Sequence, residues 1–257
     1  MPTVAVLGLG EAGSRLAGDL VEGGAEVRAY DPERRDVEGV VRACAAEAAV
    51  AGADVVLSVN SPAAAVGAAR AALPALSQGS IYADLNTAAP ELKREIADLV
   101  EGAGARFADV ALLGAVPATG IRTSALASGA GARAFADAFV PLGMPVEVVS
   151  ELPGAAAASK LLRSVFMKGI AAAAIESLEA AEAAGRRDWL EGQLAAVLGE
   201  PLLQRLVEGS RRHAARRVDE MEAARDLLLT LGIEPRIATA SASVLAALAA
   251  APQSGGR

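Results

Sequence analysis

The chain has 257 residues, of which 53% are hydrophobic and only 3% aromatic, so it can bury one large or two ordinary cores without disulfides or metal ions. Its formal net charge is −7 and no long block of Lys and Arg occurs, which argues against a nucleic-acid partner. The single cysteine, Cys44, excludes an internal disulfide and a thiolate metal cluster, and we interpret it as a small buried side chain.

Neither a secretion signal nor a membrane span is expected. The chain starts directly with the apolar run 4–7, without the basic region and cleavage site of a signal peptide. Glu176, Glu179 and Glu182 soon follow the apolar residues 171–174, so the apolar segments stay shorter than a membrane span. We expect a soluble, cytoplasmic protein with no membrane partner.

Short β-rich runs alternate with helical stretches up to about residue 150. The expected strands are residues 4–7, 26–30, 54–59, 80–84, 106–110 and 124–127. Strands separated by helices predict a mostly parallel, doubly wound sheet. The fold class is therefore α/β, a Rossmann doubly wound sheet followed by an all-α C-terminal domain.

The composition changes around residues 145–154, where Pro, Gly and Ser precede a segment with almost no strand signal. We place a domain boundary here, which gives domains of residues 1–150 and 151–251 and a disordered tail of residues 252–257. Helices are expected over residues 155–184, 189–198, 201–231 and 235–249, and Gly209 is a candidate break in the third.

A glycine pattern directly follows the first expected strand and opens a helix, which is the context that makes Gly-x-Gly-x-x-Gly informative. Gly8 allows the tight turn, Gly10 lets the backbone approach a pyrophosphate, and Gly13 permits close packing of helix against strand. The helix N-terminus then offers N–H groups and a positive dipole end to the phosphates. The pattern predicts that residues 1–150 bind NAD(H) or NADP(H); the alternative is a helix that merely starts with glycines.

The residues after the second strand leave the choice of cofactor open. Asp31 lies about 20 residues beyond the glycines, where a carboxylate can accept hydrogen bonds from the adenosine ribose, and this favours NAD. Arg34 and Arg35 follow it, and their guanidinium groups could instead reach the 2′-phosphate of NADP.

Several stretches together resemble the β-hydroxyacid dehydrogenase and 6-phosphogluconate dehydrogenase superfamily over nearly the whole chain. The glycine run is similar to the opening motif of that family, and residues 59–62 to the segment that lies along the cofactor. Residues 84–90 resemble its Asp-x-Ser-Thr-x-x-Pro substrate motif, and Gly154 followed by Lys160 resembles its Gly-x-x-x-x-x-Lys signature. The C-terminal helices look like those of a little-characterised branch.

The resemblance implies residue roles, a nicotinamide cofactor and a homodimer paired through the helical domains. Lys160 would be the general acid or base, with Asn86 and Thr87 at the substrate. An N-cap for the helix at Pro90 is the alternative role of Asn86 and Thr87. The implied cofactor-binding residues are Gly8, Leu9, Gly10, Glu11, Ala12, Gly13, Asp31, Arg34, Val59, Asn60 and Ser61.

Three departures from the family pattern bear on the substrate. The family's Ser-Gly-Gly segment, which grips a substrate carboxylate, reads Leu113-Gly114-Ala115 here, so only Gly114 is retained as a substrate candidate. The family's Asn one turn after the lysine is Ser164, which can still hydrogen-bond. A simple hydroxy acid is therefore a less secure substrate than the hydride chemistry itself.

Lys160 also stands out from its own surroundings. Alanines precede it and two leucines follow it, and desolvation lowers the pKa of a lysine toward the range in which it exchanges protons near neutrality. Ser164, four residues on, shares its helix face and is the second catalytic candidate. An ordinary solvated helix lysine is the alternative.

His213 is the only histidine, which excludes a Ser-His-Asp triad or a multi-histidine metal site within one chain. It lies among arginines, and Arg212 and His213 are candidates for binding an anionic substrate group, the alternative being a solvated helix face. We expect an NAD(P)-dependent dehydrogenase or reductase that acts on a small-molecule alcohol or carbonyl. The other hypotheses are an imine reductase and a non-catalytic dinucleotide sensor.

Overall fold

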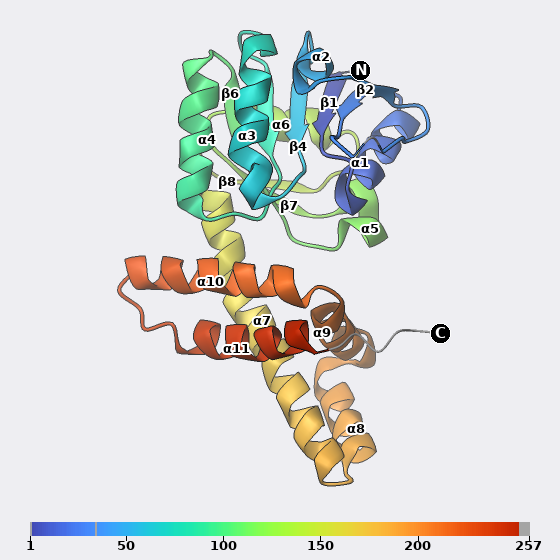
Figure 1. Ribbon diagram of the computed structural model, residues 1–257, viewed down its shortest axis with the longest axis vertical. Coiled ribbons are helices and arrows are strands. Elements are labelled where there is room, and N and C mark those ends of the chain that lie inside the picture. The colour runs from blue at the N-terminus through green and yellow to red at the C-terminus, as the bar shows by residue number, and fades with distance from the viewer. Residues whose placement is uncertain (1, 34, 252–257) are drawn as a thin grey trace. The chain divides into compact units, whose positions relative to one another are not determined.

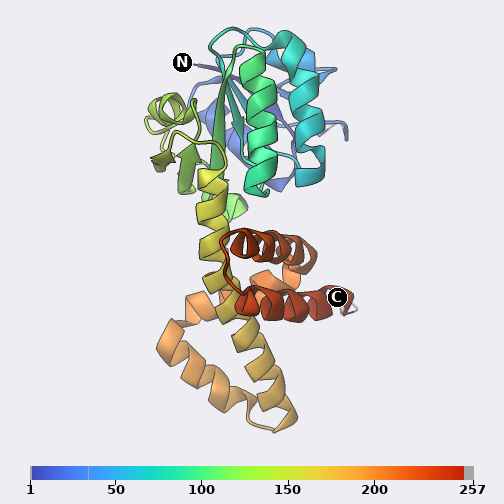
Figure 2. The same cartoon turned by 90° about the vertical axis from the view of Figure 1, so that its left-hand side faces the viewer.

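The computed structural model describes residues 2–33 and 35–251, which belong to two compact units, Met1–Lys160 and Leu161–Arg257 (Figures 1 and 2). The division falls inside α7 (Ala155–Ala183), whose first turns belong to the first unit. The tail predicted to be disordered, residues 252–257, lies outside the described residues.

The first unit is built on an eight-stranded sheet with the order β3-β2-β1-β4-β5-β6-β7-β8. Neighbouring strands are parallel except β6 and β7, which are antiparallel. The strands are β1 (Thr3–Leu7), β2 (Glu26–Tyr30), β3 (Val41–Arg42), β4 (Val55–Ser58), β5 (Ile81–Asp84), β6 (Arg106–Leu112), β7 (Ala125–Ser128) and β8 (Val146–Ser150).

Helices cover both faces of this sheet, and every residue of its central strands β4 and β5 is buried. One face packs against α1 (Glu11–Glu22), α5 (Val116–Thr119) and α6 (Ala132–Phe139). The other packs against α2 (Ala46–Val50), α3 (Pro62–Ala72) and α4 (Pro90–Gly102), and Figure 1 shows α3 and α4 side by side in front of the sheet. Two 3₁₀ turns, η1 (Leu73–Ala75) and η2 (Gly120–Arg122), complete the unit.

The strand order places the functional edge of the sheet. β1 lies between β2 and β4, so the chain reverses its direction of travel through the sheet at the carboxyl end of β1, where doubly wound proteins bind ligands. Asp84 at the end of β5 is the register partner of Asp109 on β6, which puts two carboxylates on adjacent strands.

The second unit is helical. Two apolar cores hold it together: one joins Leu161 to Met221 and Leu245, and the other joins Ile175 to Leu203. In Figures 1 and 2, α10 and α11 lie side by side. The helices after α7 are α8 (Arg187–Leu198), α9 (Glu200–Arg212), α10 (Ala214–Thr230) and α11 (Arg236–Ala250).

The predicted fold class is confirmed, with corrections to single elements. β3 and β8 were not predicted, because β3 is two residues long and β8 lies in the Pro- and Gly-rich region read as a linker. The third predicted helix breaks at His213 and not at Gly209. Cys44 was expected to be buried and is exposed, since it lies in the turn between β3 and α2.

Across the described residues, no helix combines the length and the apolarity needed to cross a membrane.

Candidate active site

The glycine loop between β1 and α1 is shaped by backbone contacts that exclude a side chain. Gly8 has φ +106°, and a Cβ there would lie 2.3 Å from the carbonyl oxygen of Val59. A Cβ on Gly13 would lie 1.9 Å from the carbonyl oxygen of Gly8. Both distances are far below van der Waals contact, so the turn requires glycine at these two positions.

Gly10 differs from the other two glycines because no described residue lies close enough to exclude a side chain there. Its backbone, with φ −64°, suits any residue, and the nearest atom to a Cβ built there is Nη1 of Arg35, at 3.8 Å. Gly10 is the N-cap of α1 and provides no side-chain cap, and Glu11 and Ala12 form the first turn. The loop therefore leaves a cradle beside the helix N-terminus, and this cradle fits a pyrophosphate.

Asp31, at the end of β2, holds the glycine loop in place. Its carboxylate accepts hydrogen bonds from the backbone N–H of Leu9 at 2.6 Å and of Glu33 at 2.8 Å, and the side chain is 9% exposed. Each carboxylate oxygen keeps a further lone pair for a ribose hydroxyl. Leu9 itself is buried in the core.

An arginine does lie at the glycine loop, and it is Arg35. Its guanidinium donates to the carbonyl oxygen of Leu9 at 3.3 Å and forms an ion pair with Glu33 at 2.5 Å. Arg34, the predicted cofactor residue, lies outside the described residues. The sequence named both arginines as able to reach a 2′-phosphate; among the described residues, the contact with the loop comes from Arg35.

The segment after β4 lies against the glycine loop. Val59 donates its backbone N–H to Leu7, and Asn60 donates its side-chain amide to Ser58 at 3.1 Å. The buried side-chain oxygen of Asn60 has no hydrogen-bond partner among the described residues, which is a polar group suited to a ligand donor. Ser61 caps α3, accepting from the N–H of Ala64 at 3.3 Å.

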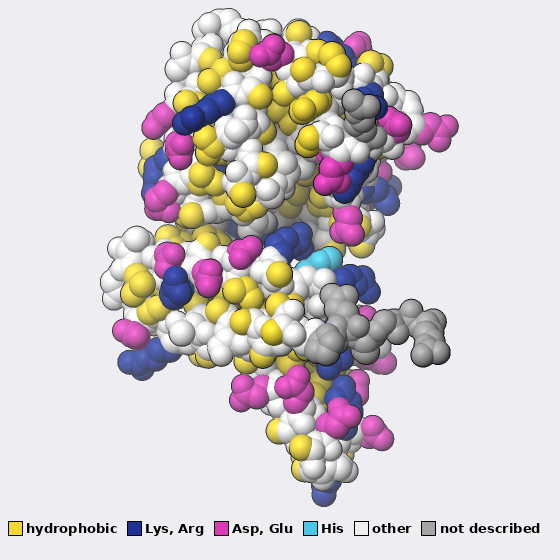
Figure 3. All heavy atoms as spheres, viewed as in Figure 1, with side chains coloured by type: hydrophobic (Ala, Val, Ile, Leu, Met, Phe, Trp, Pro, Cys, Tyr) yellow, Lys and Arg dark blue, Asp and Glu magenta, His cyan; other side chains and the backbone are white. Residues whose placement is uncertain are grey.

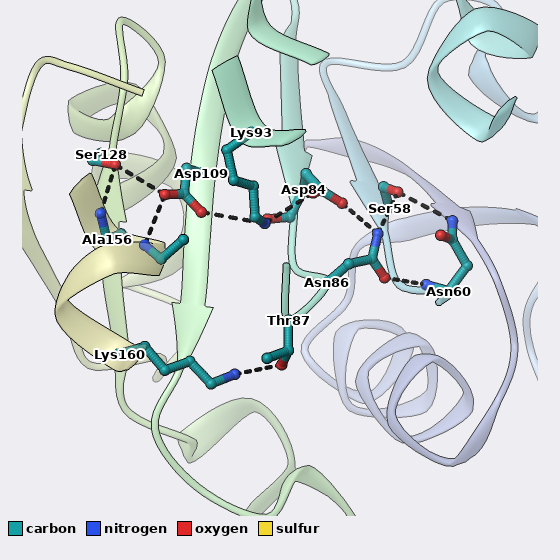
Figure 4. Close-up of polar contacts among 11 residues, drawn as sticks. Ser58, Asn60, Asp84, Asn86, Thr87, Lys93, Asp109, Ser128, Ala156 and Lys160 are labelled. Atoms are coloured by element: carbon teal, nitrogen blue, oxygen red, sulfur yellow. Dashed lines mark hydrogen bonds and ion pairs between the residues drawn. The ribbon is translucent and has the colours of Figure 1, made fainter. Parts of the chain in front are cut away.

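Asn86 is 5% exposed and ties together the ends of two strands (Figure 4). Its amide nitrogen donates to Ser58 at 3.1 Å and to the carboxylate of Asp84, and its oxygen accepts from the backbone N–H of Asn60 at 2.7 Å. The N-cap of α4 is Ala89, without a side-chain cap. The alternative role of Asn86 and Thr87 as helix caps is therefore wrong.

Lys160 and Thr87 meet at the same edge of the sheet. Nζ of Lys160, in the second turn of α7, donates to Oγ1 of Thr87 at 2.7 Å (Figure 4). The two residues are far apart in the sequence and were predicted separately. This contact brings the predicted general acid or base to the predicted substrate loop.

The ammonium group of Lys93 is fully buried between two carboxylates. Lys93 of α4 donates to the Asp84 carboxylate at 2.8 Å and to the Asp84 carbonyl at 2.9 Å, and its Nζ is 3.2 Å from Oδ1 of Asp109. Burial alone would lower the pKa of Lys93, but the two carboxylates outweigh it and hold this pKa above its ordinary value. The ammonium therefore stays protonated.

Side chains of the strands β6 and β7, and not residues of α7 itself, accept hydrogen bonds from the first backbone N–H groups of α7. The other oxygen of Asp109 accepts from the backbone N–H of Ala157 at 2.9 Å and from the hydroxyl of Ser128 at 3.2 Å. Oγ of Ser128 accepts from the backbone N–H of Ala156 at 2.9 Å. Gly154, with φ +88°, lets the chain pass so close to α4 that a Cβ would meet the carbonyl oxygen of Pro90 at 2.8 Å.

In the second unit, Ser164 belongs to a separate polar cluster. Its hydroxyl donates to the carboxylate of Glu220, which also accepts from Lys168 at 2.8 Å. Burial lowers the pKa of Lys168 below its usual value, and the carboxylate of Glu220 only partly opposes this.

Of the remaining substrate candidates, Gly114 belongs to the first unit, and Arg212 and His213 belong to the second. Gly114 lies in the loop after β6, where a Cβ would be 3.3 Å from a methyl carbon of Thr123. Arg212 is exposed at the end of α9, and His213 forms the break before α10; the histidine is visible on the face shown in Figure 3.

Sequence reasoning did not predict that Lys93, Asp84 and Asp109 form a buried cluster of charges. One signal was available: the chain has 21 arginines but only three lysines. Arginine cannot replace lysine where a compact or titratable cation is needed. The rarity of lysine therefore makes Lys93, Lys160 and Lys168 candidates for positions that need a compact or titratable cation.

Comparisons with known proteins agree with this architecture. Residues 3–139 match the family described as the NAD binding domain of 6-phosphogluconate dehydrogenase, and residues 181–248 match a domain of unknown function (DUF1932). A curated relative, an uncharacterized 28.5 kDa protein of Methanothermus fervidus, is 28% identical over 158 residues. The match covers 60% of this chain and 61% of that protein, so the chain aligns with less than two thirds of that relative's length.

Solved structures are similar over almost the full chain. A conserved protein of unknown function, described as structurally similar to 3-hydroxyacid dehydrogenases, is 31% identical with a TM-score of 0.74 and 96% coverage of both chains. The 3-hydroxyisobutyrate dehydrogenase of Mycobacterium tuberculosis is 21% identical, with a TM-score of 0.82 over 97% of this chain and 94% of that chain. At that identity the second likeness establishes the fold.

Proposed function

Because the chain belongs to the family of the NAD binding domain of 6-phosphogluconate dehydrogenase, we propose that it is an NAD(P)-dependent oxidoreductase acting on a small-molecule alcohol or carbonyl. The observation that carries the proposal is the hydrogen bond from Lys160 to Thr87. Thr87 follows the carboxyl end of β5, at the edge of the sheet where doubly wound proteins bind ligands. An amine that can exchange a proton is held there beside a hydroxyl that can orient a substrate oxygen.

The residues of the chain supply the proton chemistry. When bound, the nicotinamide supplies or accepts the hydride. As a carbonyl is reduced, its π electrons move to the oxygen, and Lys160 donates a proton to that oxygen. Lysine is then neutral and regains a proton from water; in the oxidation direction the neutral amine removes the hydroxyl proton. Thr87 orients the substrate oxygen toward Nζ.

The substrate loop is rigid, which favours a defined geometry for the reaction. Three hydrogen bonds join Asn86 to Asp84, to Ser58 at the end of β4 and to Asn60 just after β4. Fixing the groups in advance lowers the entropy lost on reaching the transition state. Leu113 and Ala115 stand where the family has Ser and Gly in the segment that grips a substrate carboxylate. This favours a substrate without a carboxylate over a simple hydroxy acid.

The nucleotide is NAD(H) or NADP(H), held on the glycine loop. Asp31 favours the ribose hydroxyls of NAD, and Arg35 offers a guanidinium for the 2′-phosphate of NADP. Since Arg35 already forms an ion pair with Glu33, the added phosphate would have to compete with that carboxylate. The two nucleotides are therefore distinguished by the side chains of the loop after β2.

We further propose a homodimer formed through the helical unit. Leu162 and Phe166, one turn apart on α7, are 45% and 66% exposed. A Cβ on Gly169 would be 2.8 Å from a methyl carbon of Ile237, which is itself 57% exposed. These side chains make a continuous apolar stripe across two helices, as is typical of an interface.

The test is oxidation of NADH and NADPH with a panel of aldehydes, ketones and imines, followed by Lys160 variants on the substrates found. Lys160→Ala and Lys160→Arg should each lower kcat by about 100-fold or more, because neither side chain donates a proton near neutrality. Nucleotide Kd should stay within about twofold, since the glycine loop is unchanged. Unaltered turnover in Lys160→Ala would remove the acid/base assignment, turnover of imines alone would favour an imine reductase, and no turnover by wild type would favour a sensor.

A further inference from the structure

The fully buried lysine of α4 takes no direct part in the proposed reaction, yet it connects all the segments that carry it. The side chain of Lys93 is 1% exposed, and those of Asp84 and Asp109 are 0% exposed. A buried ion pair by itself contributes little to net stability, because desolvation offsets the attraction. The retention of three buried charges therefore points to a role in fixing geometry.

Lys93 fixes the substrate loop through Asp84. The ammonium bonds to both the carboxylate and the carbonyl of Asp84, while the second carboxylate oxygen accepts from Asn86. Asn86 directly precedes Thr87, which accepts the hydrogen bond of Lys160. Two hydrogen bonds and one peptide bond, which run through Asp84 and Asn86, thus separate the buried ammonium from Thr87, the loop residue that Lys160 contacts.

Lys93 also fixes the start of α7 through Asp109. One oxygen of Asp109 faces the ammonium, and the other accepts from the backbone N–H of Ala157. That N–H belongs to the first turn of the helix that carries Lys160. Since the first residues of α7 are alanines, the helix provides no capping side chain of its own there, and its direction depends on Asp109 and Ser128.

These contacts close a ring (Figure 4). Lys160 contacts Thr87, the substrate loop joins Thr87 to Asp84, and Asp84 binds Lys93. Lys93 in turn lies against Asp109, which binds the first turn of α7, the helix that carries Lys160. We propose that Lys93 is a positioning residue that, through Asp84 and Asp109, holds Lys160 against Thr87. This rests on the proposed function for its significance, but the positioning itself is measurable without turnover.

The three lysines of the chain make a direct test possible. Full-length protein is labelled with trinitrobenzenesulfonate, and the labelling rate of each lysine is measured by peptide mass spectrometry. The readout is the ratio of the Lys160 rate to the Lys168 rate, in which Lys168 reports on general loosening. In Lys93→Met the ratio should rise by about fivefold, the factor expected when one hydrogen bond is lost.

A charge-balanced variant separates positioning from stability. Lys93→Met leaves two buried carboxylates without their cation, whereas Lys93→Met with Asp84→Asn removes one charge of each sign and keeps Asp109 bonded to α7. Thermal unfolding should show the double variant to be more stable than the single one. If Lys93 positions Lys160, the labelling ratio stays raised in the double variant although its stability is recovered.

Arg94→Met is the matched control, because Arg94 is the next residue of α4 and forms an exposed ion pair with Glu91. Its labelling ratio should equal that of wild type. A rise of less than about threefold in a folded Lys93 variant, or an equal rise at Lys160 and Lys168, overturns the proposal. So does failure of both Lys93 variants to fold, since Lys93 would then serve the fold alone. A wild type without turnover would refute the proposed function and leave the labelling result standing.

Discussion

Gly10→Ala is predicted to weaken nucleotide binding strongly without damaging the fold. The substitution adds one methyl group at the N-cap of α1. Since the backbone there has φ −64° and the nearest atom to the new Cβ is 3.8 Å away, the protein itself accommodates the methyl group. A pyrophosphate does not, because it must approach the backbone at this position to reach the helix N-terminus.

The magnitudes follow from these contacts. Losing the N-cap preference for Gly costs a few tenths of a kcal/mol to about 1 kcal/mol, and the smaller entropy of the unfolded chain returns about 0.4–1 kcal/mol. Tm should therefore change by less than about 4 °C. Binding loses at least one charge-assisted hydrogen bond of about 1.5–3 kcal/mol, which raises Kd about 10- to 100-fold.

Isothermal titration with NADH and NADPH, alongside thermal unfolding, measures both quantities. Gly18→Ala is the matched control: it is the same substitution on the same helix, and its Cβ would have an ordinary contact of 3.9 Å with Val37. It should leave Kd unchanged and raise stability by about 0.5–1 kcal/mol, as a glycine in a helix interior does when replaced. A wild-type Kd in Gly10→Ala would refute the assignment of this loop as the phosphate site.

Three further outcomes are expected. Arg35→Ala should weaken NADPH binding by about fivefold and leave NADH within twofold, because the exposed guanidinium contributes about 1 kcal/mol to a phosphate contact; equal losses for both nucleotides would contradict this. Phe166→Asp should convert the proposed dimer to a monomer in light scattering, whereas Val197→Asp on α8, a position even more exposed to solvent, should not. Glu220→Gln should move the labelling of Lys168 to lower pH, because it removes the carboxylate that opposes the effect of burial on the pKa of Lys168; a shift to higher pH would be evidence against that pairing.

The sequence predicted the sheet and the glycine loop because their signals are local. Gly8, Gly10 and Gly13 follow a strand at fixed spacing, and each spacing corresponds to one steric requirement. The structure separates these requirements: a Cβ would lie 2.3 Å from backbone at Gly8 and 1.9 Å from backbone at Gly13, whereas at Gly10 it would have an ordinary contact of 3.8 Å with the side chain of Arg35. At Gly8 the close contact comes from Val59, in the segment after β4, so the motif alone does not reveal it.

The parts that were missed depend on contacts distant in sequence. β3 is a two-residue strand defined only by its pairing with β2, and β8 is exposed on alternate residues and bounded by Pro and Ser. Asn86 was weighed as a helix cap because it precedes Pro90 by four residues. Its partners Asp84 and Ser58 come from two strand ends, and only the strand order brings them together.

The three lysines illustrate how composition and geometry combine. The chain has 21 arginines and three lysines, and each lysine makes a polar contact with another side chain. Lys93 fits as a compact cation between two carboxylates, where a planar guanidinium would need more room. Lys160 meets a hydroxyl with an amine that can release its proton, and Lys168 is held with a lowered pKa beside a carboxylate. Replacing each lysine in turn by arginine would keep the positive charge but would lose the small size and the titratable proton. The three substitutions would therefore show at which position charge alone is enough.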